Sequence, residues 1–237
     1  MTTRKICLMG DSQAGALKLG WNRIHGEFPH VEITFFAGRS TDWHSVTVSD
    51  RKLVPGAEHL RDQLRRSSRG LEEISADYDA YMICGIGLGF GRPLGLWTDH
   101  AHQDWESYRT AVAAFVRGSG CAYILAKLRE ITAMPALILP APFQHSGSIS
   151  RPLDDATAAR LRANFFGECE KLAAEHGAVL ATQPPQTVAA DGISTRTEFA
   201  APAPPDAPRR DRYHCNEDYG ALVMANVLKI ALRPIAD

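Results

Sequence analysis

The sequence predicts an α/β fold in which helices cover both faces of a mainly parallel sheet. Five short apolar runs are spaced along the chain, and longer amphipathic stretches separate them. This alternation is typical of βαβ units, whose crossover helices lie on the two faces of a parallel sheet. With 237 residues, of which 45% are hydrophobic, the chain can form one sizeable core. We therefore expect one domain over residues 1–237.

The first half of the chain is expected to supply three of the strands. Each is a short apolar run that ends at a glycine: Gly10, Gly38, and the glycine-rich segment that starts at Gly85. Glycine is a frequent stop signal for such runs. The expected strands are 5–9, 31–37 and 81–86, and the expected helices are 12–25 and 58–66.

The second half is expected to be richer in helices. Apolar residues at 161, 165, 169 and 172 recur at helical spacing and place one face of a long helix on the core. Asn216 is a good N-cap for the last helix, while four prolines within 199–208 predict a loop before it. The expected helices are 99–117, 121–131, 154–176 and 217–232, and the expected strands are 136–139 and 178–181.

Composition disfavours several classes of protein. The formal net charge is −1, whereas nucleic-acid binding usually requires a concentrated basic face, so we interpret the Arg65-Arg66 and Arg209-Arg210 pairs as solvated surface. Five scattered cysteines show no metal-ligand spacing and favour a reducing compartment. With no signal peptide or transmembrane segment recognisable, we expect a cytoplasmic protein that does not insert into membranes.

The strongest local motif is Gly10-Asp11-Ser12, at the junction of a buried strand and a helix. Ligands of parallel sheets bind at the carboxyl ends of the strands, where the Ser12 hydroxyl would project. The Ser12 amide, at the start of the helix, could point at a developing oxyanion. The alternative is that Asp11 or Ser12 only caps the helix. The GxSxG nucleophile elbow is not matched, because Ala14 stands at its last position.

His214 is the most suitable of the nine histidines to act as the base that activates this serine. It stands in Asp211-Arg212-Tyr213-His214, between the proline-rich loop and the last helix. The spacing allows Asp211 to accept a hydrogen bond from the imidazole and to support its positive charge. The alternative is a polar surface turn, since Asp-x-x-His alone is a weak signal.

With these motifs the chain resembles the SGNH/GDSL hydrolases over nearly its whole length. The resemblance implies a three-layer α/β/α sandwich with five parallel strands in the order 2-1-3-4-5, and a catalytic triad of Ser12, His214 and Asp211. It also implies that Gly38, after the second strand, and Ser12 donate their backbone amides to the oxyanion. No cofactor or metal is implied.

The third block departs from the family pattern, which is Gly-x-Asn-Asp with the asparagine as an oxyanion donor. Here the segment is Gly85-Ile86-Gly87-Leu88, so Gly87 replaces the asparagine. Losing one such donor can remove roughly 3 kcal/mol of transition-state stabilisation. A backbone amide at Gly87 could take its place, or the protein could be a weak or inactive member. A side chain could also substitute; the candidates are Arg39, Arg92 and Gln144.

Polar residues after the second and fourth strands, and Arg92 after the third, are candidates for substrate binding. Arg39, Arg92 and Gln144 could line a polar cleft that holds a sugar, as could Ser40 and His145; exposed loop positions are the alternative. Three tryptophans could stack on a sugar ring, although packing is their more common role. They are Trp43, Trp97 and Trp105.

Two further patterns carry less weight. His100 and His102 could begin a metal site, but the ligand set is incomplete, and an exposed helix is the alternative. The glycine-rich segment does not match a dinucleotide motif, because Phe90 or Arg92 stands where the third glycine is required.

The function that these residues predict is that of a serine hydrolase acting on short-chain O-acyl esters, with acetyl esters of carbohydrates as the expected class. An O-acyltransferase on the same fold is an alternative. A non-catalytic carbohydrate-binding protein is another, motivated by Gly87. A nucleotide-binding α/β protein is the alternative outside the family. The sequence leaves the oligomeric state open.

Overall fold

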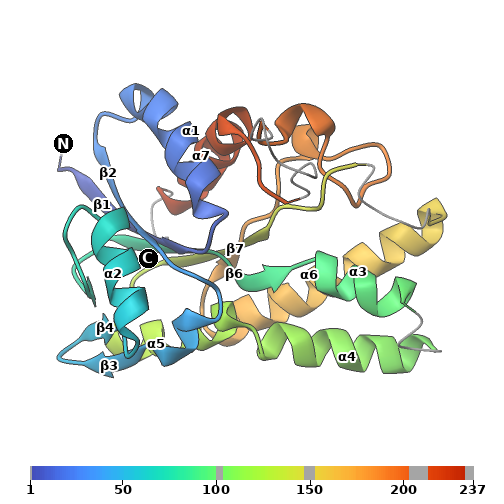
Figure 1. The fold of residues 1–237 in the computed structure, drawn as a ribbon, viewed down its shortest axis with the longest axis horizontal. Helices are drawn as coiled ribbons and strands as arrows, with labels where there is room; N and C mark the ends of the chain where they lie inside the picture. The colour runs from blue at the N-terminus through green and yellow to red at the C-terminus, as the bar shows by residue number, and fades with distance from the viewer. Residues whose placement is uncertain (1, 100–103, 147–152, 203–212, 233–237) are drawn as a thin grey trace.

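A five-stranded parallel sheet lies at the centre of the computed structural model, which describes residues 2–99, 104–146, 153–202 and 213–232 (Figure 1). Counted in chain order within this sheet, the strands lie 2-1-3-4-5, as expected. The expected strands are thus confirmed, with shifts of up to three residues at their ends. From one edge to the other they are β2 (Val31–Ala37), β1 (Arg4–Gly10), β6 (Ala80–Gly89), β7 (Ala136–Ala141) and β8 (Val179–Leu180).

Helices cover both faces of this sheet, so the α/β/α architecture is confirmed (Figure 1). The alternation of β1 shows how the layers form: Ile6 and Leu8 pack against α1 and α7, whereas Cys7 and Met9 face the other helices. On the first face lie α1 (Ala14–Ile24) and α7 (Glu217–Ala231); the second layer contains α2 (Glu58–Ser67), α4 (Trp105–Arg117), α5 (Gly120–Ile131) and α6 (Asp155–Glu175).

The segment between β6 and α4 differs from the expectation. A helix, α3 (Gly91–Thr98), opens where none was predicted, and α4 begins at Trp105 rather than at residue 99. Glycine and proline disfavour helices in general, but Pro93 lies in the first turn, where a missing N–H costs nothing. Pro93 and Leu94 are buried, so tertiary packing overrides the low helix propensity.

A second, antiparallel sheet was also not predicted. It consists of β3 (Thr47–Ser49), β4 (Lys52–Val54) and β5 (Ile74–Ser75). Its strands have only two or three residues, too few to show an alternating pattern. Short 3-10 helices complete the chain, namely η1 (His25–Glu27), η2 (Asp42–Ser45), η3 (Pro185–Thr187) and η4 (Thr197–Phe199).

Among the described helices, none is by itself long and apolar enough to cross a membrane. The two helices α4 and α5 pass that test of length and composition only as a pair, with a bend of 46° between them. Their apolar side chains, such as Val112 and Leu125, are buried in the core.

The helices α1 and α7 touch backbone to backbone, at Gly20 and Gly220 (Figure 1). A Cβ atom on Gly220 would overlap the carbonyl of Ala16, and one on Gly20 would overlap the backbone of Gly220 and Ala221. The absence of side chains at both positions therefore sets the distance between the two helices. This contact joins the N-terminal segment of the chain to its last helix.

We expect Gly220→Ala to lower the free energy of unfolding by at least about 2 kcal/mol, because the added methyl group forces the helices apart. The gain in helix propensity, about 1 kcal/mol, is too small to offset this loss. The control is Gly167→Ala in α6, where an added Cβ meets nothing within 4 Å and should stabilise the protein slightly. Urea unfolding followed by circular dichroism measures both. Equal effects of the two substitutions would contradict the close contact.

Candidate functional site

The carboxylate of Asp11 connects three segments at the carboxyl end of the sheet. Its Oδ1 accepts a hydrogen bond from the Gln13 amide at 3.0 Å, and its Oδ2 accepts from the Ser40 hydroxyl at 2.7 Å and from the Ile86 amide at 2.9 Å. Asp11 is only 9% exposed, so these donors replace the water that it loses on folding. The ends of β1, β2 and β6 are thereby held together.

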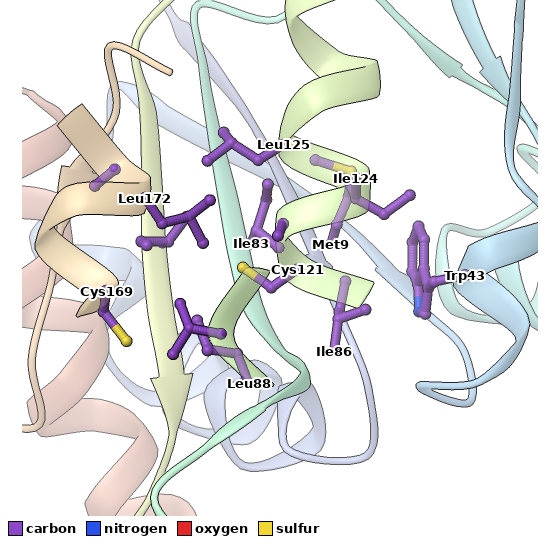
Figure 2. Packing of buried hydrophobic residues seen from close by; sticks show 14 of the residues in the cluster. Met9, Trp43, Ile83, Ile86, Leu88, Cys121, Ile124, Leu125, Cys169 and Leu172 are labelled. Atoms are coloured by element: carbon purple, nitrogen blue, oxygen red, sulfur yellow. The ribbon is translucent and has the colours of Figure 1, made fainter. Parts of the chain in front are cut away.

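The glycine-rich segment forms an irregularity within β6. Gly85, Ile86 and Gly87 all have positive φ, at 67°, 49° and 75°, and the register with β7 shifts between Cys84 and Gly89. Such a bulge re-aims backbone groups without ending the strand. The expected end of the strand at residue 86 was therefore wrong. The strand continues because Ile86 and Leu88 are fully buried in the core shown in Figure 2.

Ser12 is exposed and follows β1 directly. Its carbonyl accepts a hydrogen bond from the Gly15 amide at 3.2 Å, but its hydroxyl forms none within the described part of the chain. The side chain of Asp11 accepts from the Gln13 amide, but α1 begins after Gln13 and has no side-chain cap. Neither Asp11 nor Ser12 therefore caps the helix, and the Ser12 hydroxyl is left available for chemistry.

Gly38 differs from its expected role as an oxyanion donor. Its amide donates to the Gly10 carbonyl at 3.0 Å and extends the ladder between β1 and β2, so this N–H is already satisfied. A Cβ atom at Gly38 would also overlap the Leu60 side chain. The glycine is explained by the close approach of α2, and its amide is not among the available oxyanion donors.

The backbone of His214 is held from two sides. Its carbonyl accepts hydrogen bonds from the Ala201 amide at 2.9 Å and from Nε2 of His145 at 2.8 Å. Because a carbonyl only accepts, His145 carries its proton on Nε2. His145 is 3% exposed and so supports His214 from inside the protein rather than lining a cleft. Asp211 lies outside the described residues, and the triad of Ser12, His214 and Asp211 stays a prediction.

Two cavities meet at Asp11. The first, of about 520 Å³, is lined by Ser12 together with residues that follow β2 and residues on α2. The second, of about 390 Å³, is lined by Gln13, Gly87 and Tyr213 among others. Tyr213 directly precedes His214, so the C-terminal segment reaches the site. Of the predicted binding residues, Arg39 lines the first cavity, whereas Arg92 and Gln144 line the second, where Gln144 donates to the Tyr213 hydroxyl at 3.3 Å.

Other candidates do not form part of this site. Trp43 is fully buried, and Trp97 and Trp105 pack against each other with ring centroids 5.7 Å apart. The three tryptophans therefore have packing roles, which was the stated alternative to stacking on a sugar. The His100 and His102 pair lies outside the described residues.

Cys84 lies at the point where β6 leaves β1, yet its thiol is not a competing nucleophile. Burial, and to a smaller degree the charge of Asp11, raises the pKa of Cys84 well above its ordinary value. A thiol with a raised pKa is protonated and unreactive. Cys84 is thus a poor candidate for a nucleophile at this edge of the sheet.

Two residues that line the site, Gln63 and Arg66, are not predicted from the sequence. Arg66 was assigned to solvated surface, but α2 places it in the wall of the cavity that contains Ser12, together with Gln63. Helical spacing puts residues 63 and 66 on one face. No signal in the sequence shows that this face turns towards the GDS motif.

We expect Asp11→Asn to lower the free energy of unfolding by about 2 kcal/mol. The NH₂ group of asparagine would replace one carboxylate oxygen and would face a hydrogen-bond donor in a buried contact, so that both donors would lack an acceptor. A matched control is Asp191→Asn. Asp191 also accepts from two amides and a serine hydroxyl, but it is exposed and its donors, Ile193 and Ser194, are local. Thermal unfolding should show a loss at Asp11 that is about twice that at Asp191. Equal losses would refute a long-range role for Asp11.

Comparison with known proteins agrees with this architecture. No protein-family model matches the sequence, and no curated protein is similar to it. Some solved structures are similar. One is an extracellular lipase of Streptomyces rimosus, which is 13% identical in sequence and has a TM-score of 0.54. The alignment covers 97% of this chain and 100% of the lipase chain. A Streptococcus pneumoniae protein described as a platelet activating factor has 12% identity and a TM-score of 0.51, covering 98% of this chain and 86% of its own.

At such identities the likeness concerns the fold and not the chemistry. Both structures align over nearly all of this chain, including the layers that position Ser12 and His214. The motifs of the sequence and the topology of the sheet agree with this likeness. The chain has the fold of the SGNH/GDSL hydrolases.

Proposed function

We propose that this protein is a serine esterase that acts on short-chain O-acyl esters through an acyl-enzyme on Ser12. The observation that carries the proposal is the Ser12 hydroxyl, which is exposed at a cavity and is not used to cap the helix behind it. Ester hydrolysis is the activity that the name of the similar Streptomyces rimosus lipase states. That likeness supports the proposal through the fold alone.

In the proposed reaction, Ser12 Oγ attacks the acyl carbonyl while the imidazole of His214 takes its proton. The tetrahedral intermediate collapses, and the alcohol leaves with the proton from His214. Water then attacks the acyl-enzyme with His214 again as base and releases the acid. In this scheme Asp211 orients His214, and His145 and Ala201 hold the backbone of His214 in place.

The oxyanion requires donors, and two backbone amides are proposed. The Ser12 amide forms no hydrogen bond within the described residues, and it lies beside the positive end of the α1 dipole. Gly87 lines the neighbouring cavity, and the shift of register leaves residues 85–88 outside the ladder with β7. In this proposal the bulge supplies a backbone amide at the position where the SGNH/GDSL motif supplies an asparagine side chain.

The cavities suit a small and hydrophilic substrate. Their volumes, about 520 and 390 Å³, lie in the range of ordinary small-molecule sites. Charged and amide side chains line them, as expected for an acetylated sugar or a similar polar ester. Because the two cavities meet at Asp11, one could hold the acyl donor and the other an acceptor hydroxyl. This observation favours acyl transfer as the second candidate function.

We expect Ser12→Ala to lower hydrolysis of 4-nitrophenyl acetate by about 10³-fold or more, because the acyl-enzyme cannot form. Ser49→Ala, at the exposed end of β3, is the control for contaminating esterases and should keep the full rate. Release of 4-nitrophenol measures the rate. If wild type and Ser12→Ala are equally inactive, a non-catalytic binding protein becomes the better account.

Gly87→Asn should raise kcat, because the new side chain would supply the missing donor, worth roughly 3 kcal/mol at most. The site has room, since an added Cβ meets only the Gly120 nitrogen at 3.7 Å, and asparagine tolerates positive φ better than most residues. Gly87→Ala is the control that carries the backbone strain without the donor. It should destabilise the protein by about 1 kcal/mol and should not raise kcat. Equal kcat values for the two variants would place the oxyanion elsewhere.

A further inference from the structure

Two arginines in the cavity beside Ser12 have no carboxylate partner. Within the described residues, neither Arg39 nor Arg66 forms an ion pair, although both line this cavity. Neighbouring arginines of α2 are paired: Arg61 lies 2.6 Å from Glu58, and Arg65 lies 2.6 Å from Asp62 and 3.2 Å from Glu72. Among the residues that the structure describes, the α2 arginines outside the cavity lining are thus paired, whereas Arg66 in the lining is not.

Hydrogen bonds hold the backbone under both arginines. The Arg39 amide donates to Oε1 of Gln63 at 3.1 Å, which attaches the loop after β2 to α2. The Ala37 amide donates to the Ser67 hydroxyl at 2.9 Å, which fixes the last turn of α2 against the end of β2. Two different elements thus present one guanidinium each to the same cavity, and both elements are anchored.

The net charge of the cavity wall is positive. Asp11 is the acidic residue of the lining, and its two oxygens already accept from Gln13, Ser40 and Ile86. Arg39 and Arg66 each contribute a cationic guanidinium group to this lining. Their planar pairs of donors match the oxygens of a carboxylate or a phosphate. A concave wall with two such groups and a nucleophilic serine fits an anionic substrate better than a neutral one.

We propose that the cavity lined by Ser12, Arg39, Gln63 and Arg66 binds an anionic group of the substrate, so that the esters cleaved here carry a carboxylate or a phosphate. This inference rests on the proposed function for the cleavage step and on the arginines for the binding step. In the cleavage step Ser12 takes the acyl group, the alcohol leaves with a proton, and water regenerates the serine. The anionic group takes no part in bond changes; the arginines hold it.

Three acetyl esters of similar shape separate charge from size. They are 4-acetoxybenzoate, 4-acetoxyphenyl phosphate and the neutral 4-acetoxybenzamide. We expect kcat/KM for the two anions to exceed that for the amide by about tenfold or more. The preference should shrink in 1 M salt, where the Debye length falls from roughly 10 Å to about 3 Å. A carboxylate preference over phosphate, or the reverse, identifies which anion the site prefers.

Arginine variants show whether the preference comes from this cavity. Arg39→Gln and Arg66→Gln should each reduce the ratio of anionic to neutral kcat/KM by about fivefold, mainly through KM. Arg65→Gln removes the same charge from the same helix, but Arg65 is paired and lies outside the cavity lining, so it should leave the ratio unchanged. A similar loss in Arg65→Gln would reveal only a general field effect and would overturn the proposal.

A binding measurement separates this inference from the proposed function. Calorimetry with 4-acetoxybenzoate and Ser12→Ala protein tests binding without turnover, and Arg66→Gln in that background should weaken it by about fivefold. Arginine-dependent binding without any Ser12-dependent turnover would support the anion site and refute the esterase. Turnover of all three esters at equal rates, insensitive to the arginines, would refute the anion site and leave the esterase in place.

Discussion

The buried carboxylate of Asp11 is the contact on which the rest of the site depends. Parallel strands end at one edge of a sheet, but nothing in the sheet itself fixes the loops that follow them. Asp11 does so, because a carboxylate that is 9% exposed needs donors, and the donors come from Gln13, Ser40 and Ile86. The same carboxylate holds the Gln13 amide just before α1, and Ser12, the residue between them, is exposed.

The bulge of β6 follows from that contact. A Cβ atom at Gly85 would lie 2.7 Å from Oδ1 of Asp11, so only glycine allows the strand to pass so close. Ile86 and Leu88 anchor the segment in the core (Figure 2), and Gly87 between them lines the second cavity. Gly87 therefore belongs to a segment whose positive φ angles form the bulge. The departure from the SGNH/GDSL motif at Gly87 thus coincides with the bulge in β6.

The last helix, α7, packs against the first helix, α1. Its contact with α1 at Gly20 and Gly220 holds the residues before it near the site, where Tyr213 lines the same cavity as Asp11 and Gln13. His145 supports that segment from the core. Arg39 and Arg66, which form no ion pair within the described residues, line the cavity of Ser12, where β2 and α2 meet. The proposed acyl chemistry and the proposed anion binding thus use different elements around one fixed carboxylate.

Features that depend on local pattern could be predicted from apolar periodicity and residue preference. They are the five strands, the position of Ser12 after the first strand, and the Asn216 cap, which accepts from the Tyr219 amide at 3.1 Å. Three other features emerge only in the folded chain: the Gly38 amide belongs to the sheet, α3 forms despite its glycines, and Arg66 lines the cavity that contains Ser12. These features depend on contacts between residues that lie far apart in the chain. Such contacts are set by how helices and strands pack against one another and not by neighbouring residues in the sequence. They therefore produce no periodic pattern from which they could be predicted.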